Sequence, residues 1–148
     1  MEGLPMQELL ARLYRTFAEQ FEAGMAEAGF GDVTLAHGTN VLRFVDDDGV
    51  RVGVVASRSG LTKQAISQQV KYLEAHGYLI VSPDPGDQRS KLIRQTARGR
   101  ECRAVARALF SEIEQLWSRR LGAAQAADLR ASLEHAAAQL GDVRSSSP

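Results

Sequence analysis

The 148-residue sequence predicts a mainly α-helical fold with one small β-hairpin. Apolar residues recur at three- and four-residue steps through most of the chain, which is the period of an amphipathic helix. Residues 78–95 instead read as two strands around the Pro- and Gly-containing turn Pro83–Asp87. The apolar fraction of 44% and a formal net charge of zero indicate a folded chain rather than a disordered one. The length suits a single domain.

Composition excludes several classes of protein. No run approaches the roughly 18 consecutive apolar residues of a membrane span, so we expect no membrane partner. The N-terminus lacks the basic segment and apolar block of a secretion signal, which makes the cytoplasm the expected compartment. A disulfide scaffold is excluded because Cys102 is the only cysteine.

Two helices are predicted in the N-terminal third. The first begins after Pro5 and ends near Gly29. The second is capped by Thr34, carries apolar residues as far as Val45 and ends at the turn 46–49. Three adjacent carboxylates in that turn invite a metal-site interpretation. Contiguous side chains diverge, however, and we favour a solvated turn.

The middle of the chain predicts a helix-turn-helix followed by a wing. A short helix at about 52–58 leads into a tight turn at Gly60. Thr62 is the expected N-cap of the next helix, and Gly77 the left-handed residue that ends it. The basic hairpin follows, and two helices with such a hairpin describe a winged helix-turn-helix.

The C-terminal segment carries a signal about assembly. Thr96 is the expected cap of a long helix over about 97–120, Gly122 breaks it, and a last helix covers about 123–140. The long helix has two adjacent apolar stripes where a surface helix needs one. We therefore favour a symmetric homodimer, the alternative being a monomer whose terminal helices wrap the middle of the chain.

Charge is segregated along the sequence. Residues 1–50 hold three basic and nine acidic groups, residues 51–103 hold ten and four, and residues 104–148 hold five of each. The basic middle segment favours a polyanionic partner. On the helix that Thr62 is expected to cap, the face opposite the core has donor side chains and no carboxylate before Glu74. Such a face is expected for contacts to phosphates and base edges. The expected DNA contacts are Thr62, Lys63, Gln64, Ser67, Gln68, Lys71, Asp87, Arg89 and Lys91.

These residues resemble the DNA-binding lobe of MarR-type (multiple-antibiotic-resistance) transcription regulators. The matching motifs are LT-x-x-x-I-S at 61–67, LE-x-x-G-Y at 73–78, and D-x-R followed by T-x-x-G at 87–99. The resemblance implies one MarR-like domain over 1–148, with dimerisation helices at 1–30 and 97–140, a winged lobe at 34–96 and a polar tail at 141–148. It also implies a homodimer that binds a pseudo-palindromic operator in double-stranded DNA, most often as a repressor relieved by a small molecule.

Carried onto this chain, the resemblance assigns roles to particular residues. The recognition helix is 62–76, in the major groove, and the wing is 83–94, in the minor groove. Arg89 would be the minor-groove arginine, with Asp87 bracing its guanidinium. The ligand crevice between the dimer helices and the lobe would be lined by Tyr14, Phe17, His37, Val41 and Phe44.

Several positions depart from the family pattern. Ser59 and Gln69 stand where aliphatic residues are usual, and Gln95 replaces a common Leu before Thr96, which predicts a thinner lobe core. Gln68 occupies a position that is often Arg, so base preference does not carry over. Arg51 stands where Ser or Thr would cap the third helix.

Other activities find little support. We see no nucleophile with a base, no phosphate loop and no usefully spaced carboxylate pair, so we expect no enzyme and no cofactor. His37, His76 and His135 lack metal-ligand spacing. Cys102 is either a thiol activated by nearby arginines or, as we favour, a small packed residue. The rival to DNA binding is a winged-helix module that acts through protein contacts.

Overall fold

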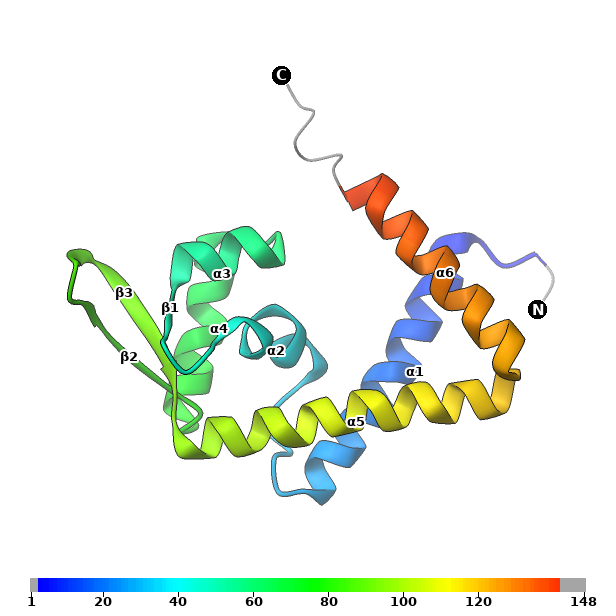
Figure 1. The fold of residues 1–148 in the computed structure, drawn as a ribbon, viewed down its shortest axis with the longest axis horizontal. Helices are drawn as coiled ribbons and strands as arrows, with labels where there is room; N and C mark the ends of the chain where they lie inside the picture. The colour runs from blue at the N-terminus through cyan, green and yellow to red at the C-terminus, as the bar shows by residue number, and fades with distance from the viewer. Residues whose placement is uncertain (1–2, 142–148) are drawn as a thin grey trace. The chain divides into compact units, whose positions relative to one another are not determined.

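A computed structural model describes residues 3–141. The chain forms two compact units, Met1–Phe110 and Ser111–Pro148, and each is described by itself. The fold is mainly helical with a small antiparallel sheet, so the predicted fold class is confirmed (Figure 1). Of the predicted polar tail at 141–148, all but Gly141 lies outside the described residues.

Helix α1, Met6–Glu27, follows the predicted apolar stripe. Pro5 precedes it with φ −60°, and Gly29 ends it with φ +90°. The left-handed Gly29 lets the Phe30 N–H bond the Met25 carbonyl at 2.8 Å, which closes the last turn. Only the C-terminal half of α1 is buried, through Phe21 and Met25.

The second predicted helix is shorter than expected. Helix α2 covers Leu35–Asn40, and a 3₁₀ turn, η1, covers Leu42–Phe44. Thr34 caps α2 as predicted, in a reciprocal capping box with His37. The helix breaks at Val41 (φ −126°), because the chain turns there to bury Val41, Leu42 and Val45 together.

The helix-turn-helix is confirmed. Helix α3 covers Val52–Ser59, and Gly60 makes the turn with φ +73°. Helix α4 covers Lys63–Ala75, and the Thr62 hydroxyl accepts the Ala65 N–H at 3.1 Å, as an N-cap does. Its buried face consists of Ile66, Val70 and Leu73.

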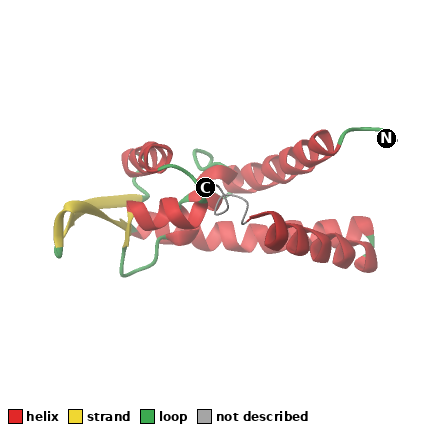
Figure 2. Ribbon diagram, turned by 90° about the horizontal axis from the view of Figure 1, so that it is seen from above, coloured by secondary structure: helices red, strands yellow, loops and turns green. Residues whose placement is uncertain are grey.

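The wing has three strands rather than the two predicted. Strands β2 (Leu79–Asp84) and β3 (Asp87–Gln95) form the hairpin, and β1 (Val50–Arg51) pairs with the other edge of β3, giving the order β1-β3-β2. The strands extend into the predicted turn, because Asp84 pairs with Asp87 in the ladder. The hairpin extends from the helices of its unit as a ribbon (Figure 2).

The junction between the wing and the long helix explains the T-x-x-G motif. The Thr96 hydroxyl accepts the Gly99 N–H at 2.9 Å and donates to the Gly77 carbonyl at 2.6 Å. A Cβ at Gly99 would overlap the carbonyl oxygen of Tyr78, so only glycine fits. Tyr78 is itself fully buried, and its hydroxyl donates to Asp32 and accepts from Arg98.

Helix α5 covers Ala97–Leu121 and starts in the first unit. There Phe110 stacks on Phe21 of α1, with ring centroids 4.9 Å apart, and α1 thereby closes over the buried face of α5. In the second unit Gly122 (φ +88°) separates α5 from α6, Ala123–Leu140. Arg130 of α6 pairs with Glu114 of α5 at 2.9 Å. Within residues 3–141, no helix is long and apolar enough to cross a membrane.

Candidate nucleic-acid interface

The outward face of α4 presents the predicted contact residues together. The core side of the helix uses Ile66, Val70 and Leu73, so the remaining positions point away from the lobe. The single carboxylate of α4 is Glu74, in its last turn. The face therefore offers hydrogen-bond donors without acidic competition, as contacts to phosphates and base edges require. Its exposed residues are Thr62, Lys63, Gln64, Gln68 and Lys71, and Ser67 is half-buried.

Glu74 has a structural role that the sequence did not reveal. Its carboxylate accepts the backbone N–H of Val81 at 3.1 Å, which joins the end of α4 to strand β2 of the wing. Tyr72, also on α4, donates its hydroxyl to the Asp32 carbonyl at 2.7 Å. These two bonds fix the orientation of the helix relative to the wing and to the loop before α2.

The wing places Arg89 and Lys91 on β3 as exposed cations. The predicted pairing of the Asp87 carboxylate with the Arg89 guanidinium is wrong. Asp87 instead accepts the backbone N–H of Arg89 at 3.0 Å and the hydroxyl of Ser90 at 3.3 Å. A donor two residues along the backbone is reached without ordering a long side chain, which is why this local bond forms. Asp87 therefore shapes the turn that carries Arg89.

An ion pair holds the base of the turn. Asp84 is buried, accepts the Gly86 N–H at 2.9 Å and pairs with the Arg51 Nε of β1 at 2.5 Å. The Gly86 N–H, together with Arg51, holds the pKa of Asp84 below its usual value. Arg51 is thus a wing anchor. This role could not be predicted from local sequence, because the two partners lie 33 residues apart.

A cavity of about 490 Å³ lies beside the lobe, among α1, α2, η1 and α5. Of the five residues predicted to line a ligand crevice, Tyr14 and Phe17 line this cavity. The other three do not: Val41 is fully buried, the Phe44 ring lies under the Arg43 guanidinium, and His37 stacks on Tyr72. The early end of α2 turns Val41 into the core, whereas His37, inside α2, faces Tyr72 of α4. The lining residues are Tyr14, Phe17, Leu35, Gly38, Thr39, Leu42, Arg43, Arg103, Ala106, Arg107 and Phe110.

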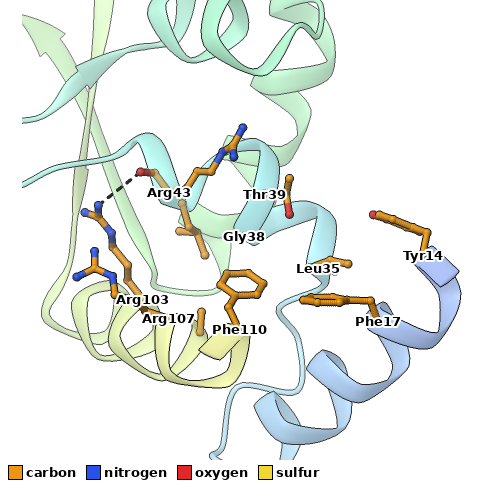
Figure 3. Close-up of a pocket in the computed structure, with 11 residues that line it drawn as sticks. Tyr14, Phe17, Leu35, Gly38, Thr39, Arg43, Arg103, Arg107 and Phe110 are labelled. Atoms are coloured by element: carbon orange, nitrogen blue, oxygen red, sulfur yellow. Dashed lines mark hydrogen bonds between the residues drawn. The ribbon is translucent and has the colours of Figure 1, made fainter. Parts of the chain in front are cut away.

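The cavity combines aromatic walls with positive charge. Figure 3 shows the rings of Phe17 and Phe110 close to Leu35, and Arg103 reaching toward the backbone of Arg43. The lining residues include three arginines, Arg43, Arg103 and Arg107, and no acidic residue. Such a lining suits a ligand with an apolar body and an anionic group.

His37 makes the lobe sensitive to pH. Its Nδ1 accepts the Thr34 N–H at 3.0 Å, which requires an unprotonated nitrogen. Burial, and then the nearby His76, lower the pKa of His37 from the usual 6.5, against the opposing charges of Asp32 and Glu22. The folded chain takes up this proton at a lower pH than the unfolded chain, whose His37 has the usual pKa of 6.5, so stability falls as pH drops below that value.

We therefore expect the melting temperature to fall between about pH 7.5 and pH 5.5, and to fall less in His37→Gln. Glutamine can complete the same capping box without titrating. Circular dichroism melts at the two pH values measure the difference. His135→Gln is the matched control and should keep the wild-type loss. An identical pH dependence in His37→Gln would show that His37 is not the responsible group.

Cys102 lies where the packed-residue interpretation expects it. The side chain is fully buried, and burial raises the pKa of its thiol to about 11, so it is a packed thiol at neutral pH.

Potential metal ligands do not cluster in the described part of the chain. Within residues 3–141, no three His, Cys, Asp or Glu side chains form a group that could hold a metal ion.

Comparisons with known proteins also point to a winged helix-turn-helix fold. A model of the MarR family matches residues 32–90, which include the helix-turn-helix and the wing turn. No curated protein matches the chain by sequence. The fold is similar to that of MarR, at a TM-score of 0.78 and 19% identity over 98% of this chain and 97% of that one.

Two further neighbours are structures of DNA complexes. The transcriptional repressor CouR, bound to a 23-mer DNA duplex, has a TM-score of 0.73 and 24% identity over 93% of this chain and 92% of that one. MepR of S. aureus, in a DNA complex, has a TM-score of 0.74 and 19% identity over 89% and 96% of the two chains. At these identities the likeness establishes the fold.

Proposed function

We propose that this chain, whose residues 32–90 match a model of the MarR family, is a homodimeric repressor that a small ligand releases from its DNA operator. The observation that carries the DNA-binding assignment is the outer face of α4, which has no carboxylate before Glu74 in its last turn, beside a wing with exposed cations. CouR and MepR, which share the fold, are described in complexes with DNA.

The two parts of the lobe have different tasks in this proposal. The recognition helix, 62–76, enters the major groove, where Gln64 and Gln68 read base edges while Lys63 and Lys71 contact phosphates. The wing, 83–94, places Arg89 in the minor groove, whose negative potential attracts a guanidinium. The bond between Glu74 and the Val81 N–H keeps both at a fixed spacing.

The terminal helices supply the dimer. The N-terminal half of α1 leaves Met6, Leu10 and Leu13 exposed, and α6 leaves Leu133 and Leu140 exposed. Apolar stripes of this size on two helices are typical of a subunit interface. We assign 1–30 and 97–140 to dimerisation and 34–96 to DNA binding within one MarR-like domain. A two-fold dimer then presents two recognition helices to a pseudo-palindromic site.

The cavity is the proposed effector site. Its three arginines and aromatic walls favour an aromatic carboxylate or a related apolar anion. CouR from Rhodococcus jostii RHA1, a fold neighbour at a TM-score of 0.66, is described bound to p-coumaroyl-CoA. Because the lining comes from α1 and α5 as well as from the lobe, a bound ligand can favour one position of the lobe over another.

We expect 2-naphthoate to raise the melting temperature of the protein and 2-naphthamide, its neutral counterpart of equal size, to raise it much less. The acid supplies the anion that the arginines can pair with, and the amide does not. Arg107→Gln should reduce the effect of the acid and leave that of the amide unchanged. Differential scanning fluorimetry measures all four combinations. Equal effects of acid and amide would contradict the anionic site.

Selection of the DNA duplexes that the protein binds from a pool of random sequences tests the DNA-binding proposal. The same experiment identifies the operator sequence. The protein is expected to enrich a pseudo-palindrome with half-sites about one helical turn apart. The matched control is Lys63→Glu/Lys71→Glu, which reverses charge on the exposed face and should enrich nothing. A wild-type protein that also enriches nothing would favour a module that acts through protein contacts.

Replacing Gln64 by Ala is expected to cost on the order of 1–3 kcal/mol in DNA affinity and to relax preference at one base position. A bidentate amide contact to a base edge is lost, whereas the phosphate contacts remain. Affinities for single-base variants of the selected duplex reveal this pattern. A uniform loss across all variants would make Gln64 a backbone contact instead.

A further inference from the structure

The carbonyl of Val45 connects the cavity to the wing. It accepts the Gln95 Nε2–H at 2.8 Å and the Arg103 Nη1–H at 2.6 Å. Gln95 is the last residue of β3, and Arg103 lies on α5 in the wall of the cavity. One buried oxygen is therefore shared by a side chain of the wing and a side chain of the proposed effector site.

The fold explains why this oxygen needs side-chain donors. Val45 follows η1 in an extended conformation, with ψ 109°, so the helical hydrogen-bond pattern ends there. The residue is fully buried, which keeps water from the carbonyl. A buried carbonyl left without partners is costly, and its two lone pairs can accept both donors at once.

Among Val45, Gln95 and Arg103, the unusual residue is Gln95. A Leu at this place, common in the family, could pack but could not donate. In this chain Gln95 is only 6% exposed, and its backbone pairs with Leu79 at the base of the wing hairpin. The position that the sequence marked as a thinning of the core therefore holds a buried amide tied to the strand that carries Arg89.

Arg103 is the member that a ligand can reach. Its guanidinium also donates to the Arg43 carbonyl at 3.4 Å, and both arginines line the cavity (Figure 3). Both acceptors are neutral carbonyls. A carboxylate in the cavity is a stronger acceptor for a guanidinium than a neutral carbonyl, because it carries a full negative charge and can accept two parallel N–H bonds from the planar guanidinium.

We infer that Gln95 is a positioning residue which, through the Val45 carbonyl that it shares with Arg103, couples occupancy of the cavity to the position of the wing. An anion in the cavity draws the Arg103 guanidinium away from the Val45 carbonyl. The segment after η1 then keeps only one of its two side-chain hydrogen bonds, the one from Gln95. A shift of this segment is transmitted through Gln95 to β3. The inference rests on the proposed function, because it needs both a ligand in the cavity and DNA on the wing.

Coupling of this kind is reciprocal. The factor by which the ligand weakens DNA binding must equal the factor by which DNA weakens ligand binding. A residue that only stabilises the fold changes the DNA affinity measured with ligand and the DNA affinity measured without it by the same factor, so their ratio stays constant. The ratio is therefore the readout that separates a positioning role from a structural one.

The test compares Gln95→Met with wild type. Methionine keeps the length and volume of glutamine and removes the donor, while Arg103 still satisfies Val45. DNA dissociation constants are measured by fluorescence anisotropy on the selected duplex, with and without saturating 2-naphthoate. We expect the variant to bind DNA alone within about threefold of wild type and to bind 2-naphthoate more weakly, because withdrawal of Arg103 now leaves the Val45 carbonyl without a donor. At saturating acid, the ligand-induced loss of DNA affinity should fall from roughly tenfold or more to below twofold.

Two controls make the result specific. Gln88→Met makes the same chemical change at an exposed position of β3 and should keep the full coupling. Arg103→Lys retains a donor and a charge at the cavity and should keep part of it. The ¹³C shift of the Val45 carbonyl should respond to 2-naphthoate in the DNA-free protein.

The outcomes separate the two proposals. If wild type responds to 2-naphthoate and Gln95→Met responds equally, the inference is overturned and the proposed function stands. If wild type binds neither the selected duplex nor the acid, the proposed function fails, and the coupling role of Gln95 fails with it.

Discussion

Replacing Arg89 by alanine is expected to weaken binding to the selected duplex by roughly 10- to 100-fold, about 1.4–3 kcal/mol, with no change in dimerisation or melting temperature. The side chain is exposed on β3, so its removal leaves no cavity in the core. The loss comes from a guanidinium that would otherwise replace counterions in a narrow, electronegative minor groove. Fluorescence anisotropy at two salt concentrations measures it.

The local structure of the wing gives matched controls for this prediction. Asp87→Asn keeps an oxygen for the Arg89 N–H, so the turn should hold and affinity should fall little. Arg119→Ala removes an exposed arginine of α5, in the second unit, and should bind DNA as wild type does. Unchanged affinity in Arg89→Ala would contradict the placement of the wing in the minor groove.

Replacing Leu10 and Leu13 together by Glu is expected to convert the dimer to monomer and to lower affinity for the palindrome by more than about 100-fold. Each leucine buried at an interface contributes about 1.5–3 kcal/mol, and two-fold symmetry doubles the contribution of each substitution. A buried, unpaired carboxylate adds a further penalty. The monomer retains one recognition helix and so loses the contacts of a whole half-site.

Sedimentation velocity measures the oligomeric state, and circular dichroism checks that the winged lobe remains folded. Ala11→Glu adds one such charge at an exposed position of α1 beside the stripe and should remain dimeric. A double variant that still sediments as a dimer would show that α1 does not form the interface. A monomer with full DNA affinity would show that one lobe is sufficient.

The helices could be predicted from the sequence because their signals are local. The stripe of α1, the Thr62 and Thr96 caps and the glycines at 60 and 77 each act within one or two turns of chain. The length of the second helix could not be predicted, because its break at Val41 follows from where the core lies. Strand β1 has only two residues, too few to show alternation.

The outer face of α4 could also be predicted, because the side opposite a buried stripe follows from helical periodicity. Contacts between distant segments could not. The pairs Arg51–Asp84 and Glu74–Val81 join residues whose proximity only the folded wing determines. The cavity lining includes the two predicted residues of α1, Tyr14 and Phe17, but none of the predicted residues from His37 onward. The presence of Arg103 and Arg107 of α5 in the cavity lining could not be predicted, because their spacing in the sequence does not show what they face.

The most direct test of DNA recognition by this chain is an anisotropy titration on its selected duplex and on a shuffled duplex of equal composition, each at about 50 and 200 mM salt. We predict tight binding to the selected duplex alone, two chains per site, and a loss of affinity of several orders of magnitude at the higher salt, as expected when a dimer neutralises many phosphates. Equal, weak binding to both duplexes, or no binding at the lower salt, would contradict a sequence-specific DNA-binding dimer.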